Sequence, residues 1–173
     1  IHLLSIESGE KRKFTSPPRR ERDQLPAFSP DGKTLAFVRG PRMMEGRGIY
    51  VQPLNGGEPK LLCTDEGIIS DLDWLPDGSA LVFSVIWRSG SGPMRVSAGG
   101  GTPTRLAFGE HVEAFSVAET GNRLIYSQER HSNCNIWWAA GPAAEGRNPP
   151  TELFSSTRPD WSPRFSPDGQ RVA

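Results

Sequence analysis

The stretch AFSPDGKTLAFV, residues 27–38, decides the fold because its pattern returns three more times along the chain. DWLPDGSALVFS follows at 73–84 and RFSPDGQRVA at 164–173, each with the same Pro-Asp-Gly turn. A degraded copy, AFSVAETGNRLIYS at 114–127, keeps only the glycine of the turn. The turn glycines of successive copies are 46, 43 and 48 residues apart. An internal repeat of about 40 to 50 residues that begins with strand, turn and strand is typical of a β-propeller.

The residues of the turn each have a physical reason to be there. Pro30 presets φ for the first central position, and Asp31 is expected to accept a local backbone hydrogen bond. Gly32 is expected to adopt the left-handed conformation, which closes a type I turn with a glycine bulge. The apolar run Thr34–Val38 then predicts a strand that is buried on both faces between neighbouring sheets.

Read repeat by repeat, the sequence predicts an all-β protein, a β-propeller of four-stranded antiparallel blades. Three blades are predicted to be complete, at about 26–63, 70–107 and 112–154. The fourth is predicted to be split, with residues 161–173 supplying its first two strands and residues 1–15 its last two. Joining such halves removes unpaired sheet edges.

The split blade leaves two assemblies open. A single chain could pair its own halves and close as a four-bladed ring, which demands strong curvature. Two chains could instead exchange their half-blades and form an eight-bladed homodimer with two-fold symmetry.

Composition and charge argue against two classes of partner. The 173 residues carry 20 basic and 20 acidic side chains, so net charge favours neither nucleic acid nor an anionic membrane. The basic clusters Lys11–Lys13 and Arg19–Arg22 are expected to lie on a solvated edge and loop. No apolar run approaches the roughly 18 residues that a membrane span needs. We therefore expect no nucleic-acid partner and no membrane insertion by this segment.

Motifs for catalysis and cofactor binding are not found in the sequence. It has no Gly-x-Ser-x-Gly elbow, no His-Glu-x-x-His zinc motif and no phosphate-binding glycine loop. One aspartate per turn is too few oxygen ligands for a calcium site. The sequence thus predicts no enzyme activity, no cofactor and no metal.

The strings AFSPDGKTLAFVRG (27–40) and IYVQPLNGGEPKLL (49–62) resemble the TolB-like propeller repeat, a relative of WD repeats. The resemblance is to the repeats attached to bacterial winged-helix transmembrane regulators in particular. Similar blades occur in TolB and in the non-catalytic propeller of prolyl-oligopeptidase-type peptidases. The resemblance implies a bacterial protein and favours a periplasmic or extracytoplasmic location.

In a propeller, the loops that run from an outer strand to the next inner strand emerge on one face and ring the axial channel. Here those loops are predicted at Thr15–Leu25, Thr64–Ser70, Phe108–Val112 and Ser155–Ser162. A polar funnel of mixed charge suits a protein or peptide partner. The candidate binding residues in these loops are Arg20, Arg22, Asp23, Asp65, Glu66, Glu110, His111, Arg158, Asp160 and Trp161.

The sequence therefore predicts a non-catalytic module that binds a protein or peptide, or acts as a sensor. One alternative is an accessory propeller that gates substrate for a prolyl-oligopeptidase-type hydrolase. Another is a structural propeller fragment that assembles by exchanging half-blades and has no ligand.

Overall fold

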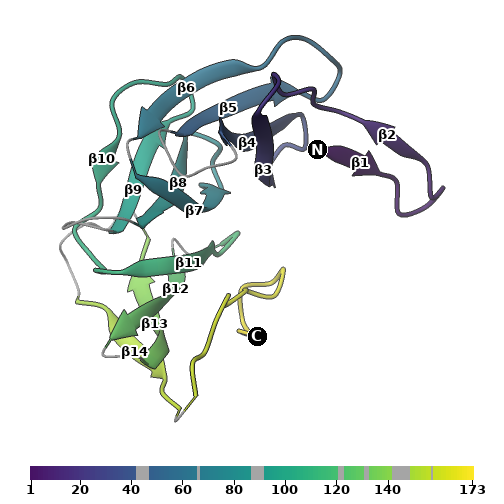
Figure 1. Ribbon diagram of the computed structural model, residues 1–173. Coiled ribbons are helices and arrows are strands. Elements are labelled where there is room, and N and C mark those ends of the chain that lie inside the picture. Colours follow the sequence, from purple (N-terminus) through teal and green to yellow (C-terminus); the bar gives the residue numbers. More distant parts are fainter. Residues whose placement is uncertain are drawn as a thin grey trace.

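The computed structural model describes residues 1–41, 47–65, 67–86, 92–120, 123–130, 133–141, 149–156 and 158–173. The regular elements in these ranges are β-strands, which form three four-stranded sheets and one two-stranded hairpin (Figure 1). No helix that could cross a membrane by its length and hydropathy occurs in these ranges.

The three large sheets follow one plan, in which strands adjacent in the chain are adjacent in the sheet and run antiparallel. The first sheet contains β3 (Glu21–Phe28), β4 (Thr34–Pro41), β5 (Arg47–Pro53) and β6 (Lys60–Asp65). The second contains β7 (Ile68–Trp74), β8 (Ala80–Ile86), β9 (Gly92–Ser97) and β10 (Thr104–Arg105). The third contains β11 (Val112–Val117), β12 (Arg123–Arg130), β13 (Asn133–Ala140) and β14 (Thr151–Phe154). This arrangement confirms the predicted all-β fold of four-stranded antiparallel sheets.

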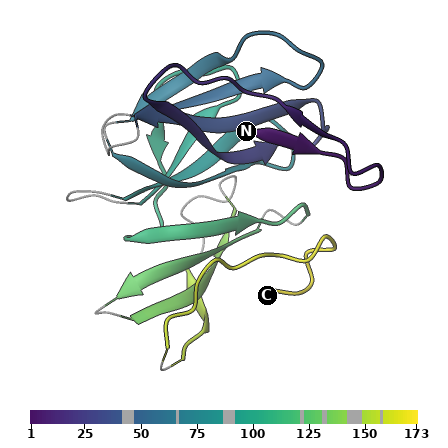
Figure 2. The same ribbon diagram turned by 45° about the vertical axis from the view of Figure 1, so that its right-hand side comes forward.

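The three sheets form an arc, and shorter segments lie at its two ends (Figures 1 and 2). A hairpin of β1 (His2–Leu4) and β2 (Lys11–Lys13) lies beside the first sheet. Residues 161–173 lie beside the third sheet and form one isolated bridge, between Phe165 and Val172. Among the described residues, no strand pairing joins these two segments. The composite fourth blade, made from one chain or from two, therefore stays a prediction.

Strand β8 shows why the sheets stack face against face. Leu81 and Phe83 are fully buried and belong to an apolar cluster shared with the first sheet. Ala80 and Val82 are also buried, but they belong to a second cluster, shared with the third sheet. Successive side chains of a strand point to opposite faces, so a strand buried on both faces is apolar throughout. Each fully buried Leu or Phe side chain contributes about 1.5–3 kcal/mol.

The turns that begin the repeats have the expected geometry. Gly32 adopts φ +66° and its N–H donates to the carbonyl of Ser29 at 2.8 Å. Asp31 Oδ1 accepts the N–H of Lys33 at 3.0 Å. Gly78 and Gly169 adopt the same left-handed conformation, at φ +68° and +66°. An L side chain rarely adopts this conformation, which explains the glycine in these three turns.

The inner strand of the first sheet is longer than the sequence indicated. The apolar pattern predicts a strand that starts at Pro26, whereas β3 starts at Glu21 and pairs along β4 as far as Pro41. A β-bulge between Gln24 and Ala27 interrupts the register, and this irregularity hides the strand from a search for strict alternation.

Candidate functional site

Two adjoining hollows open at the end of the inner strands where the repeat turns lie. The inner hollow, of about 460 Å³, is bordered by the ends of β3, β7 and β11 and by the last turn. The outer hollow, of about 790 Å³, lies between the first and second sheets. Pro30, Trp74 and Pro76 line both hollows. Together they form one continuous depression, which we call the turn groove.

Equivalent positions of the four repeats build the inner hollow. The residues just before each turn line it, and so do the residues at the second position of each turn. A hollow lined by equivalent positions of successive repeats lies at the axis around which the repeats are arranged. The first set is Phe28, Trp74, Val117 and Phe165, and the second set is Pro30, Pro76, Glu119 and Pro167.

The apolar part of the lining has a fixed floor and an open rim. Trp74 is only 7% exposed, and its Nε1 donates to the carbonyl of Ala27 at 3.2 Å, across the boundary between two sheets. Phe28, at the equivalent position of the first repeat, is 57% exposed. Trp74 is already held in place by packing and by a hydrogen bond, so it loses little side-chain freedom when a partner binds. The exposed ring of Phe28 adds apolar contact surface beside it.

Two aspartates of β7 connect the second sheet to the third. Asp71 Oδ2 accepts the N–H of Phe115 at 2.9 Å, and Asp73 Oδ2 accepts the N–H of Val117 at 3.3 Å. Burial raises the pKa of both carboxyl groups, and the hydrogen bonds from these N–H groups oppose that shift in part. Asp73 also lines the inner hollow, so part of its wall is set by a bond between sheets.

Arg164 and Arg123 hold the last repeat segment against the third sheet. Arg164 Nη1 donates to the carbonyl of Phe115 at 2.7 Å and lies 3.8 Å from Asp71 Oδ2. Arg123 Nη2 donates to the carbonyl of Gly169 at 2.9 Å, and its guanidinium carbon lies 5.8 Å from the ring centre of Phe165. These contacts place Phe165 at the inner hollow although its segment pairs with no strand of the third sheet.

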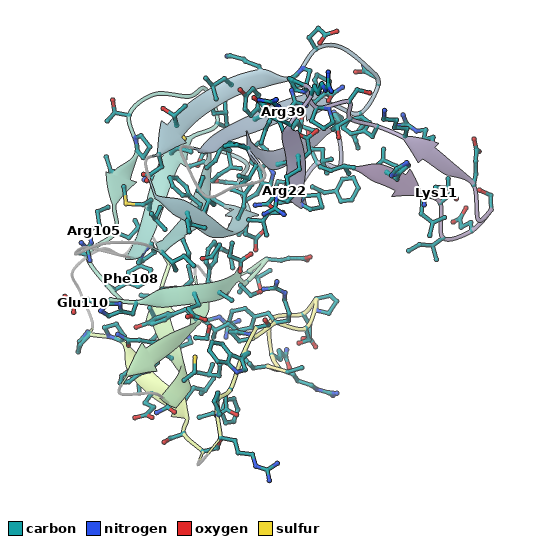
Figure 3. The ribbon with its side chains drawn as sticks, in the orientation of Figure 1. Lys11, Arg22, Arg39, Arg105, Phe108 and Glu110 are labelled. Carbon is teal, nitrogen blue, oxygen red and sulfur yellow. The ribbon has the colours of Figure 1, made fainter. Side chains whose placement is uncertain are left out.

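The described residues among those predicted at the channel mouth do not line the turn groove. Glu66 lies outside the described residues, and none of the other nine lines either hollow. Asp23 lies in β3 and not in a loop, and its fully buried carboxylate receives two hydrogen bonds from Arg39, at 2.6 and 2.9 Å. Its role is thus an ion pair within the first sheet. Arg22 lies in the same strand and is exposed (Figure 3), while Arg20 precedes the strand with φ +78°.

The remaining predicted residues lie at three separate places. Asp65 ends β6, and its Oδ1 accepts the N–H of Gly67 at 2.7 Å. Glu110 and His111 are exposed between β10 and β11, well apart from Arg22 (Figure 3). The segment 158–161 follows β14 and contains the other three, Arg158, Asp160 and Trp161, of which Trp161 is 53% exposed. This face stays a predicted binding surface.

The sequence contained a signal for the turn groove that reasoning on the turns missed. The turn residues predict hairpin geometry, and Pro30, Pro76 and Pro167 also line the inner hollow. The signal is a large aromatic residue at one repeat position, directly before the turn, as in Phe28 and Trp74. A repeated aromatic at a position that borders a turn indicates a shared surface at the repeat axis.

The described residues contain no group of three or more His, Cys, Asp or Glu side chains that could hold a metal ion. Cys63 and Cys134 are both buried, and burial raises the pKa of the Cys63 thiol to about 11. Cys63 is therefore protonated at neutral pH.

Stacked four-stranded antiparallel sheets whose inner strands end around a common axis define a protein of the β-propeller class. The family model of the TolB beta propeller domain matches residues 1–173, and the chain belongs to this family. The resemblance found in the Pro-Asp-Gly repeats is thereby confirmed.

Solved structures and a curated relative agree with this assignment. TolB from Acinetobacter baumannii is 25% identical with a TM-score of 0.80, and the match covers 99% of this chain and 41% of that chain. A chain of a nidogen/laminin complex is 14% identical with a TM-score of 0.77, covering 99% of this chain and 64% of that one, which shows a shared fold alone. An uncharacterized peptidase of Bacillus subtilis (strain 168), YuxL, is 31% identical over 85 residues, or 49% of this chain and 12% of the peptidase. The chain thus spans less than half of the TolB chain and a small part of the peptidase.

Proposed function

We propose that this chain is a non-catalytic propeller module that binds a protein or peptide in the turn groove. The observation that carries the proposal is the inner hollow, to which all four repeats contribute an apolar residue before the turn. The hollow combines these apolar side chains with polar ones, among them Ser116 and Glu119, and such a mixed lining can take up a side chain and fix its orientation. Asp73 supplies such a polar group at its wall.

A protein partner is compatible with the fold and with the charge of the chain. One structure of the same fold was solved in a nidogen/laminin complex, so the fold occurs in an assembly of proteins. Equal numbers of acidic and basic side chains, 20 of each, supply no general attraction to nucleic acid.

A second candidate is an accessory propeller of a peptidase. The identity of 31% over 85 residues with YuxL favours it. In that case, the turn groove would contact peptide substrates on their way to a catalytic domain outside these 173 residues. Both candidates require that the groove binds peptides, and they differ in whether a hydrolase domain belongs to the same protein.

The experiment selects peptides from a displayed random library on the purified chain and measures their affinity by fluorescence anisotropy. The double variant Phe28→Ala and Phe165→Ala is expected to weaken binding at least about tenfold, because aromatic anchors dominate most binding sites. The matched variant Arg22→Ala, Glu110→Ala and Trp161→Ala changes the predicted channel-mouth loops and is expected to bind normally. The opposite result would assign binding to those loops, and a library without binders would refute a peptide-binding role.

A further inference from the structure

Carboxylates outnumber basic side chains in the lining of the turn groove, while Lys33 and Arg95 lie outside the lining and near Asp31 and Asp77. The chain as a whole has equal numbers of both, so this excess belongs to the groove and not to the composition. Lys60 is the single basic side chain among the described residues that line the two hollows. The acidic lining residues are Asp73 and Glu119 in the inner hollow, and Asp31, Glu58 and Asp77 in the outer hollow.

Two of these carboxylates are held in the ionised form by the turns themselves. The hydroxyl of Ser29 lowers the pKa of Asp31 through a hydrogen bond of 2.6 Å, and the hydroxyl of Ser79 lowers the pKa of Asp77 through one of 2.7 Å. In both aspartates, Oδ1 accepts the hydrogen bond from the serine hydroxyl and also one from a backbone N–H of the turn. Both side chains therefore carry a full negative charge at the rim of the outer hollow at neutral pH.

The degraded third turn contributes a charge where the other turns have proline. Glu119 occupies the position of Pro30, Pro76 and Pro167, and it is exposed at the inner hollow. Proline has no N–H to donate, so the three intact turns offer no backbone donor at this position for an anion. The ring around the inner hollow thus combines apolar proline rings with one exposed carboxylate.

The shape of the groove suits an extended segment. The two hollows share Pro30, Trp74 and Pro76, so a chain lying over Trp74 reaches the inner hollow at one end and the outer hollow at the other. Their volumes, about 460 and 790 Å³, each accommodate more than one side chain. An extended peptide places alternate side chains on opposite sides, so it can fill the hollows with some residues and meet the rim with others.

We propose that the partner segment is an extended basic peptide. An apolar side chain fills the inner hollow between Phe28 and Phe165, and Lys or Arg side chains meet the carboxylates of Glu58, Asp77 and Glu119. This inference rests on the proposed function and adds the chemistry of the partner. Complementary charge mainly sets specificity and the rate of association, so discrimination between peptides is the property to measure.

The test uses the whole chain and three sets of short synthetic peptides that share one apolar sequence and carry Arg, Gln or Glu at the variable positions. We expect the Arg set to bind at least about tenfold more tightly than the Gln set, and the Glu set to bind most weakly. The preference for Arg should shrink at high salt because the rim charges are exposed.

Two matched double variants locate the charge effect. Glu58→Gln with Glu119→Gln removes one exposed carboxylate from each hollow and is expected to reduce the preference for Arg over Gln peptides severalfold. Glu7→Gln with Glu10→Gln removes two exposed carboxylates from the segment between β1 and β2, and is expected to leave the preference intact.

The outcomes separate this inference from the proposed function. Equal affinity for all three sets, with binding lost in Phe165→Ala, would overturn the basic partner and leave the peptide-binding groove standing. A preference for Arg that survives Glu58→Gln with Glu119→Gln would overturn the role of these carboxylates. Failure of every set to bind would overturn both proposals.

Discussion

The two boundaries between the large sheets are built from different chemistry. The boundary of the first and second sheets is an apolar cluster around Trp74, which includes Val38 and Leu62. The boundary of the second and third sheets also has an apolar cluster, around Phe115, but there Asp71 and Asp73 add hydrogen bonds to the backbone of β11. Apolar burial is non-directional, whereas each carboxylate must meet one particular N–H. The second boundary therefore specifies the register of β11 against β7, and the first mainly supplies burial.

The largest effect is expected at the apolar boundary. Trp74→Ala should lower the free energy of unfolding by about 3–5 kcal/mol, because it leaves a cavity in the cluster and removes the bond to Ala27. Guanidinium unfolding followed by circular dichroism measures the change. Trp161→Ala is the control, and since this side chain is 53% exposed its effect should stay within about 0.5 kcal/mol. Equal effects of the two variants would contradict the assignment of Trp74 to the boundary.

A smaller effect is expected at the polar boundary. Asp71→Ala should lower the free energy of unfolding by about 1–3 kcal/mol, because the N–H of Phe115 is buried and loses its acceptor. The loss is limited because the carboxylate itself is unfavourably desolvated, as its raised pKa indicates. Hydrogen exchange should show faster exchange at the Phe115 amide, with no change for the exposed control Glu58→Ala. An unchanged Phe115 amide would show that the carboxylate does not hold this strand.

The smallest effect is a difference in titration between the boundary aspartates and the turn aspartates. Burial raises the pKa of Asp71 and Asp73, whereas serine hydroxyls lower the pKa of Asp31, Asp77 and Asp168. Carbon NMR of the carboxyl groups should place the first two above the ordinary aspartate value of about 3.9 and the other three below it. If the boundary aspartates and the turn aspartates all titrated on the same side of that value, the proposed electrostatic difference between the sheet boundary and the turns would be wrong.

The signs of the pH effects are opposite. The boundary aspartates bind protons more readily in the folded chain, so their stabilising contribution is fully present below the ordinary aspartate pKa and is lost as pH rises through their raised pKa. The turn aspartates bind protons less readily when folded. Their contribution is present above the ordinary value and is lost as pH falls through their lowered pKa.

Local chemistry made the fold predictable. The Pro-Asp-Gly turns and the apolar run Thr34–Val38 indicate strand, turn and strand without any distant contact, and the structure shows these elements. The candidate site was less accessible to such reasoning. The sequence predicts Asp23 in a loop at the channel mouth, whereas its carboxylate forms an ion pair with Arg39. The two residues meet because β3 and β4 continue to pair beyond a β-bulge, which an alternating sequence pattern does not reveal.

The sequence by itself determined the repeat, the turns and the strands, because a left-handed glycine and a two-residue alternation are properties of neighbouring residues. Only the tertiary structure decided which repeat positions meet. Phe28, Trp74 and Phe165 are far apart in the chain and line one hollow, because the inner strands end around a common axis. In the same way, Asp71 reaches the backbone of β11 because the second and third sheets pack in one register. Such meetings depend on the packing of whole sheets, which is set by long-range burial and not by local pattern.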